Sequence, residues 1–195
     1  IRPVLARFAK YPLLRGFRQQ LHWHENPQYR FAPPDQIRHP RLADNINALA
    51  LHGWSFDLQV FPGQMKDAAA LAAACPDVTF ILQHAGMLAD TSAAGWKEWR
   101  SGMKRLADQP NVVTKLSAFG TFIHRNDPEF IEKMIKETLK IFGADRCMFG
   151  SNFPIEKIWT TYDDLLDAHL AATAGLPKGQ QKAIFNDTAR RIYRL

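Results

Sequence analysis

The sequence predicts an α/β fold, the C-terminal portion of a (β/α)₈ barrel of the TIM type with about five βα units. Short strand-like runs alternate with helix-like segments along the 195 residues, which is typical of parallel βα units. No glycine-rich fingerprint follows any run, which argues against a dinucleotide-binding sheet. Several runs place polar residues at every second position, as expected for strands with one face toward a barrel mouth.

Five runs are predicted to be strands, at residues 15–21, 55–61, 78–86, 111–119 and 147–153. Because side chains alternate along a strand, each run divides into two faces. The polar faces of the first, second and fourth runs carry Gly16, Arg18, Gln20 and His22, then Ser55, Asp57 and Gln59, then Lys115 and Ser117. The fifth run begins as a short buried strand at Cys147 to Phe149 and turns abruptly at Gly150, Ser151 and Asn152.

Five helices are predicted between and after these strands, at 64–75, 95–110, 127–143, 160–175 and 178–195. The first is rich in alanine and follows a Pro-Gly turn. The second spaces its apolar residues at three- and four-residue steps, a core stripe made of Trp96, Trp99, Met103 and Leu106. The third has Asp127 as a plausible N-cap, Pro128 in its first turn and Gly143 as a stop.

The composition predicts one incomplete domain that spans residues 1–195. With 46% hydrophobic residues, the chain can bury one sizeable core. It has no initiator methionine and opens like the end of a helix already under way, so we expect a barrel that lacks its N-terminal strands. Such a barrel would leave open sheet edges, which a homo-oligomer could cover.

Composition also bears on location and partners. No stretch reaches the ~18 apolar residues that span a bilayer, and no secretory signal opens the chain. Cys75 and Cys147 have no metal-like or disulfide-like spacing, which favours a reducing cytoplasm. The net charge of +6 is scattered rather than clustered, so we expect no nucleic-acid binding and instead a site for small anionic molecules.

Candidate functional residues follow from the barrel, because the carboxyl ends of its strands and the loops after them form the active site. The polar residues at these places are Arg18, His22, His24, Gln59, Gln83, His84, Lys115, Ser117, Ser151 and Asn152, with His124 in the loop after the fourth strand. Basic groups dominate, and Asp57 is the one carboxylate near a strand end. This mouth favours an anionic or carbonyl-containing substrate, whose oxygen Arg, Lys or His could polarise.

Ordinary structural roles compete with these functional ones. His84 could be a core histidine that ends a strand, although its position before glycine favours function. Lys115 ends a buried run, where an unpaired ammonium would be costly, which favours a functional or paired role. His22 and His24 have the spacing of two ligands on one strand face, but short matches of this kind are common by chance.

Five segments together, RGFRQ, FILQHAG, NVVTKLSAFG, RCMFGSNFP and IFNDTARRIYRL, resemble the lactonase-like branch of the amidohydrolase family. These are TIM-barrel hydrolases that include sugar and dicarboxylate lactonases. The resemblance implies that Arg18, in a Gly-x-Arg element, binds substrate. It implies that His84, in a His-x-Gly element, is a metal ligand or substrate contact, and it matches Lys115 to Ser117 to a Lys-x-Ser element.

Asn152 is a departure from this family pattern. The corresponding strand usually ends Gly-Ser-Asp-x-Pro, and the Asp activates water or binds metal. An amide cannot accept a proton at neutral pH and is a poorer ligand for a hard divalent ion. The family's His-x-His pair also has no counterpart in these residues, since HWH at 22–24 follows the Gly-x-Arg element. A Zn or Mn ion held through His84 is therefore a doubtful expectation.

Two functional hypotheses remain. The first is a hydrolase that opens a lactone or related cyclic ester of a small carboxylic or sugar acid. Arg18 and Lys115 would stabilise negative charge, His84 would act as base and Asn152 would orient water. His22, Gln59, Ser117 and His124 would contact the substrate. The second is a non-catalytic or degenerate barrel that binds a small anionic ligand, which the amide at Asn152 favours.

Overall fold

The computed structural model describes residues 1–195, and its centre is one sheet of five parallel strands in chain order. The strands are β1 (Gly16–Arg18), β2 (Ser55–Leu58), β3 (Phe80–Leu82), β4 (Val112–Leu116) and β5 (Cys147–Phe149). Residue pairing places Arg18 beside Asp57 and Asp57 beside Ile81 on neighbouring strands, so these side chains share one face. The predicted architecture of about five parallel βα units is confirmed.

Eight helices surround the sheet: α1 (Arg2–Phe8), α2 (Leu42–Asn47), α3 (Met65–Ala73), α4 (Ala93–Ala107), α5 (Pro128–Phe142), α6 (Tyr162–Thr173), α7 (Lys178–Lys182) and α8 (Thr188–Tyr193). The predicted boundaries of α5 are confirmed, because the Asp127 carboxylate accepts a hydrogen bond from the Phe130 backbone N–H at 3.1 Å and Gly143 ends the helix at φ +76°. The sequence patterns missed α2. None of these helices has both the length and the apolar character needed to cross a bilayer.

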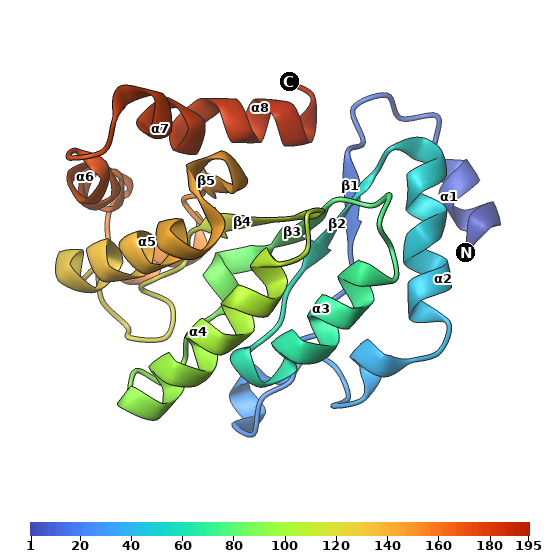
Figure 1. The fold of residues 1–195 in the computed structure, drawn as a ribbon, viewed down its shortest axis with the longest axis horizontal. Coiled ribbons are helices and arrows are strands. Elements are labelled where there is room, and N and C mark those ends of the chain that lie inside the picture. The colour runs from blue at the N-terminus through green and yellow to red at the C-terminus, as the bar shows by residue number, and fades with distance from the viewer.

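Two apolar layers lie on opposite faces of the sheet. The larger is a core of 36 buried residues between the sheet and the row of helices that Figure 1 shows beside it, α2 to α5. The predicted stripe on α4 belongs to it, since Trp99, Met103 and Leu106 are buried. The smaller layer joins β3, β4 and β5 to α8. One residue of each strand, Ile81, Val113 and Met148, packs there against Ala189, Ile192 and Tyr193.

The strands are shorter than the sequence patterns predict. The predicted strand at 78–86 ends at Leu82, and Gln83–Gly86 form a 3₁₀ turn instead. The predicted strand at 15–21 ends at Arg18, so the expectation that His22 and His24 share a strand face is wrong. Phe149 is only half-buried, in contrast to the expectation for a buried strand. In the first two cases polar residues leave the sheet as soon as the parallel ladder ends.

Candidate active site at the carboxyl ends of the strands

Four polar side chains form one hydrogen-bonded row on the inner face of the sheet, three from β1, β2 and β4 and the fourth, Gln83, from the turn directly after β3. Arg18 donates to the Asp57 carboxylate through Nη2 at 2.8 Å and through Nε at 3.2 Å. The same Nη2 donates to Gln83 Oε1 at 2.9 Å, and Lys115 Nζ donates to that oxygen at 3.2 Å. One neutral amide oxygen therefore bridges two cations.

The row carries an excess of positive charge. Arg18 has a carboxylate partner in Asp57, but Lys115 forms no ion pair and contacts only Gln83 Oε1 and the face of the Tyr193 ring, at 5.6 Å from its centroid. Two cations are thus held close together with one compensating anion. A small anion or a developing oxyanion placed here would be stabilised electrostatically.

His84 and Ser117 form a second contact next to this row. His84 Nδ1 lies 2.9 Å from Ser117 Oγ, and the hydroxyl can pair with the ring in either neutral tautomer because it both donates and accepts. A Cβ atom on Gly150 would lie 3.3 Å from Ser117 Cβ and 3.9 Å from Lys115 Cδ. The glycine at the end of β5 thus lets this strand approach both side chains.

Left-handed backbone conformations follow three of the strands. His84, Ala85 and Met87 after β3 have φ between +45° and +58°, and Ala118 after β4 and Asn152 after β5 have φ of +58° and +55°. Such conformations are costly for residues with a Cβ and persist where the surrounding structure fixes them. The Trp99 indole N–H provides one such restraint, since it donates to the Ala85 carbonyl at 2.7 Å.

The electrostatic surroundings keep His84 neutral. Burial lowers its pKa from 6.5 to about 3, and the charges of Arg18 and Lys115 act in the same direction. The imidazole therefore stays unprotonated at every physiological pH. The same cations that would attract an anionic substrate also oppose a proton on this ring.

The lowered pKa of His84 predicts that acid destabilises the fold. Below pH 6.5 the unfolded state binds a proton that the folded state does not bind until about pH 3. The free energy of unfolding therefore decreases as the pH is lowered from 6.5 to about 3. One proton changes it by about 1.4 kcal/mol per pH unit. In urea titrations between pH 4 and 7, we expect His84→Gln to show a shallower pH dependence than the wild type. Parallel curves would contradict the assignment.

His22 and Gln59 lie at the border of the site. His22 is buried, its ring centroid lies 4.6 Å from that of Phe31, and burial together with the charge of Arg18 lowers its pKa. Its Nδ1 has no hydrogen-bond partner, and neither does Gln59 Oε1, although Gln59 Nε2 approaches Met87 Sδ at 3.5 Å. Both atoms are thus buried without a hydrogen-bond partner.

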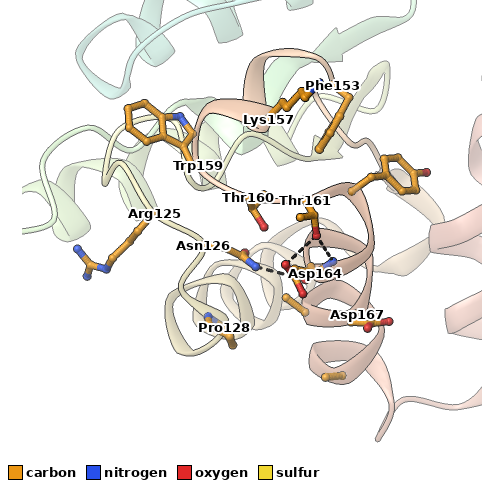
Figure 2. Close-up of a pocket in the computed structure, with 13 residues that line it drawn as sticks. Arg125, Asn126, Pro128, Phe153, Lys157, Trp159, Thr160, Thr161, Asp164 and Asp167 are labelled. Atoms are coloured by element: carbon orange, nitrogen blue, oxygen red, sulfur yellow. Dashed lines mark hydrogen bonds between the residues drawn. The ribbon is translucent and has the colours of Figure 1, made fainter.

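His124 lies away from the row, in the loop before α5. Its ring stacks on Trp159 at 4.5 Å between centroids, and no contact joins it to the other predicted site residues. A hollow of about 1020 Å³ lies next to Trp159 between this loop and the segment that leads into α6 (Figure 2). None of the predicted site residues lines it. It is an open groove with charges of both signs, so the converging groups at the strand ends remain the better candidate.

Asn152 belongs to a separate hydrogen-bonded group. Its Nδ2 lies 3.4 Å from Glu156 Oε1 and 3.5 Å from Thr121 Oγ1, and the Thr121 hydroxyl donates to Glu156 Oε1 at 2.6 Å. Glu156 is buried, with 1% of its surface exposed. This group joins the loop after β4 to the loop after β5.

The residues of this chain do not by themselves make a metal site. No group of three or more His, Cys, Asp or Glu side chains lies close enough to hold a metal ion. The Asp57 carboxylate is paired with Arg18, and Asn152 carries an amide in place of a carboxylate. A divalent ion such as Zn²⁺ or Mn²⁺ would require ligands in addition to those that residues 1–195 bring together.

Sequence reasoning missed the roles of three members of these groups. Gln83 is recognisable at a strand end, but its role as the bridge between Arg18 and Lys115 depends on its rotamer. Glu156 lies between exposed Ile155 and Lys157 and gives no sequence signal of burial. Tyr193 comes from the end of the chain, and only the packing of α8 on the inner face brings it to Lys115.

A parallel βα sheet with converging polar groups at the carboxyl ends of its strands is the arrangement found in (β/α)-barrel proteins. The family model described as Amidohydrolase matches residues 5–195, and the chain therefore belongs to the amidohydrolase family. The resemblance inferred from the sequence motifs is confirmed.

The chain is also similar to individual proteins. The chain is 35% identical to the uncharacterized protein y4mH of Sinorhizobium fredii over 193 residues, which cover 98% of this chain and 65% of that protein. It is 30% identical to an L-fucono-1,5-lactonase of Burkholderia multivorans, covering 93% of this chain and 63% of the lactonase. The chain thus spans slightly less than two thirds of these two relatives.

Solved structures show the same fold. Two crystal structures of an amidohydrolase from Burkholderia multivorans, one with bound HEPES and one with bound zinc, match with a TM-score of 0.86 at 27% and 26% identity. The match covers 98% of this chain and 69% of the solved chain. The five-stranded sheet with its helices thus shares the fold of about two thirds of these amidohydrolase chains.

Proposed function

We propose that this chain contributes the carboxyl-end site of a lactonase, which hydrolyses the ring ester of a small carboxylic or sugar acid. The observation that carries the proposal is the Gln83 oxygen shared by Arg18 and Lys115, with Asp57 as the one compensating anion. Two closely held cations suit a substrate whose carbonyl oxygen becomes negative during attack by water. The lactonase among the relatives supports the same class of substrate.

Each residue has a distinct part in the proposed reaction. Water attacks the ring carbonyl, the carbonyl oxygen becomes an oxyanion, and Lys115 Nζ stabilises it. Arg18, held by Asp57, binds a polar group of the acid portion. Breakdown of the tetrahedral intermediate breaks the ring C–O bond, and the leaving ring oxygen takes up the proton that His84 accepted from the water. The product is a hydroxy acid, which loses its carboxyl proton to solvent and whose carboxylate remains next to the cations until it leaves.

Neutral His84 is the proposed acceptor for the proton of the attacking water. Its pKa of about 3 makes it a weak base in the free protein. Binding of an anionic group between Arg18 and Lys115 would offset their charges and raise its basicity. The low pKa of the free ring favours the second candidate function, an anion-binding protein without turnover, because that function needs no base.

Free cysteines bear on the compartment. Cys75 and Cys147 are unpaired and buried, and burial raises the pKa of their thiols to about 11 and about 12. Thiols with raised pKa values are poor nucleophiles at neutral pH. The proposal accordingly assigns these cysteines no catalytic part and places the protein in a reducing compartment such as the cytoplasm.

The experiment that tests the proposed function compares hydrolysis with binding. Purified protein is mixed with a panel of 1,5-lactones of sugar acids, including L-fucono-1,5-lactone, and acid release is followed in a pH-stat. Binding of the corresponding free acids is measured by calorimetry. Acid release above the spontaneous rate supports the lactonase. Binding of the acids without acid release supports the anion-binding alternative. If the protein neither releases acid nor binds the acids, both functions are overturned.

A further inference from the structure

Glu156 is a buried carboxylate without a cationic partner. Its side chain is 1% exposed, and it forms no ion pair. Its neighbours are hydrogen-bond donors instead, the Thr121 hydroxyl at 2.6 Å and the Asn152 amide at 3.4 Å, both toward Oε1. Burying an ionised carboxylate is expensive unless specific donors compensate for the lost water. Such a group needs an explanation beyond the stability of the fold.

The backbone nearby is shaped to accept this carboxylate. A Cβ atom on Gly120 would lie 2.5 Å from Glu156 Oε2, so a larger residue at position 120 would displace the carboxylate. The Thr121 side chain comes from the next residue of the same loop. The loop after β4 therefore holds both oxygens of Glu156, one by close packing and the other by a hydrogen bond.

The carboxylate fixes which end of the Asn152 amide faces it. An ionised carboxylate only accepts hydrogen bonds, so the amide must turn its Nδ2 donor toward Glu156. The other end, Oδ1, accepts no hydrogen bond from the protein. Asn152 lies just beyond β5 in a left-handed backbone conformation, and Gly150, two residues earlier, lies close to Ser117 and Lys115. The amide thereby presents an acceptor at the carboxyl end of the sheet.

We propose that Glu156 is a positioning residue, which holds the Asn152 amide so that Oδ1 accepts a hydrogen bond from the attacking water. This inference rests on the proposed hydrolytic function. It assigns Asn152 the part of a hydrogen-bond acceptor that orients the water, while His84 accepts the proton of that water. Glu156 acts on the reaction only through the orientation of Asn152.

The test exchanges the amide and the carboxylate in a double-mutant cycle. The variants are Asn152→Asp, Glu156→Gln and the double variant that carries both changes, and asparagine and aspartate both tolerate the left-handed backbone. At pH 8 the first variant places two carboxylates in contact, which disfavours ionisation of both. We expect its melting temperature to fall by several degrees. The double variant restores one donor and one acceptor and should recover most of this loss.

Kinetics of the same variants separate positioning from plain structural support. Glu156→Gln removes the charge that orients the amide, so we expect kcat to fall about tenfold with KM unchanged. Thr121→Val keeps the volume of the side chain and removes the hydroxyl that donates to Glu156 Oε1. We expect it to lower kcat by less than Glu156→Gln does. Recovery of kcat in the double variant relative to Asn152→Asp would support the proposal.

Two results would overturn the inference. Additive melting-temperature shifts in the cycle would show that residues 152 and 156 are not coupled. A Glu156→Gln variant with unchanged kcat would show that the coupling does not serve the reaction. The melting-temperature cycle needs no substrate, so it decides the pairing even if the wild type hydrolyses no lactone, a result that would instead overturn the proposed function.

Discussion

Replacing Lys115 with methionine is expected to lower kcat/KM for lactone hydrolysis by about 10²- to 10³-fold, the range found when one oxyanion donor is removed. Methionine keeps most of the length and volume of the lysine stem while it removes the ammonium. Lys115 has no ion pair to lose, and its one hydrogen bond to protein goes to Gln83 Oε1, which Arg18 still occupies. The fold should therefore survive the change. The measurement is initial-rate kinetics by pH-stat at pH 7.

Lys66→Met is the matched control. Lys66 is exposed on α3 and forms no hydrogen bond or ion pair, so the same chemical change there should leave kcat/KM unaltered. A Lys115→Met variant that retains wild-type kcat/KM would show that this cation takes no part in the reaction. Equal losses in both variants would point to a general effect of net charge.

Gly16→Ala is expected to destabilise the fold by several kcal/mol, roughly 2–4, and to abolish activity with it. A Cβ atom at this position would lie 2.5 Å from the Ser55 backbone oxygen and 2.3 Å from Ser55 Oγ. Gly16 and Ser55 are paired across β1 and β2, so the methyl group must push these strands apart. Arg18, two residues further along β1, would then lose its alignment with Asp57. Urea unfolding and initial rates measure the two effects.

Gly179→Ala is the control for this substitution. Gly179 lies in α7, and a Cβ atom there would meet nothing within 4 Å. Alanine is a better helix former than glycine by about 1 kcal/mol, so this variant should be slightly more stable than the wild type. A Gly16→Ala variant as stable as Gly179→Ala would contradict the close approach of β1 and β2.

The alternation of polar and apolar residues made the inner face of the sheet predictable. Arg18 and Lys115 occupy inward positions because side-chain direction in a strand follows from parity alone. Asp127 and Gly143 bound α5 as predicted because capping is decided by local chemistry. These features depend on residues that are neighbours in the sequence, so the order of the amino acids is enough to reveal them.

The partners of the site residues were not predictable in the same way. Gln83 bridges two cations through one rotamer, and Glu156 is buried by a loop that lies some 35 residues earlier in the chain. His124 is expected at the mouth because it follows β4, but the loop turns its ring onto Trp159 instead. Each of these outcomes depends on tertiary packing of loops, for which the sequence gives no periodic signal.

The most direct test of the central claim is acid release from a sugar-acid 1,5-lactone by the wild type and by an Arg18→Met/Lys115→Met double variant, at equal concentration and after both have been shown to be folded by circular dichroism. If Arg18 and Lys115 stabilise the reacting oxygen and bind the acid portion, the wild type releases acid above the spontaneous rate. The double variant then releases acid only at the spontaneous rate. Equal rates for the two proteins above the spontaneous rate would contradict it, because hydrolysis would then proceed without the two cations that define the site.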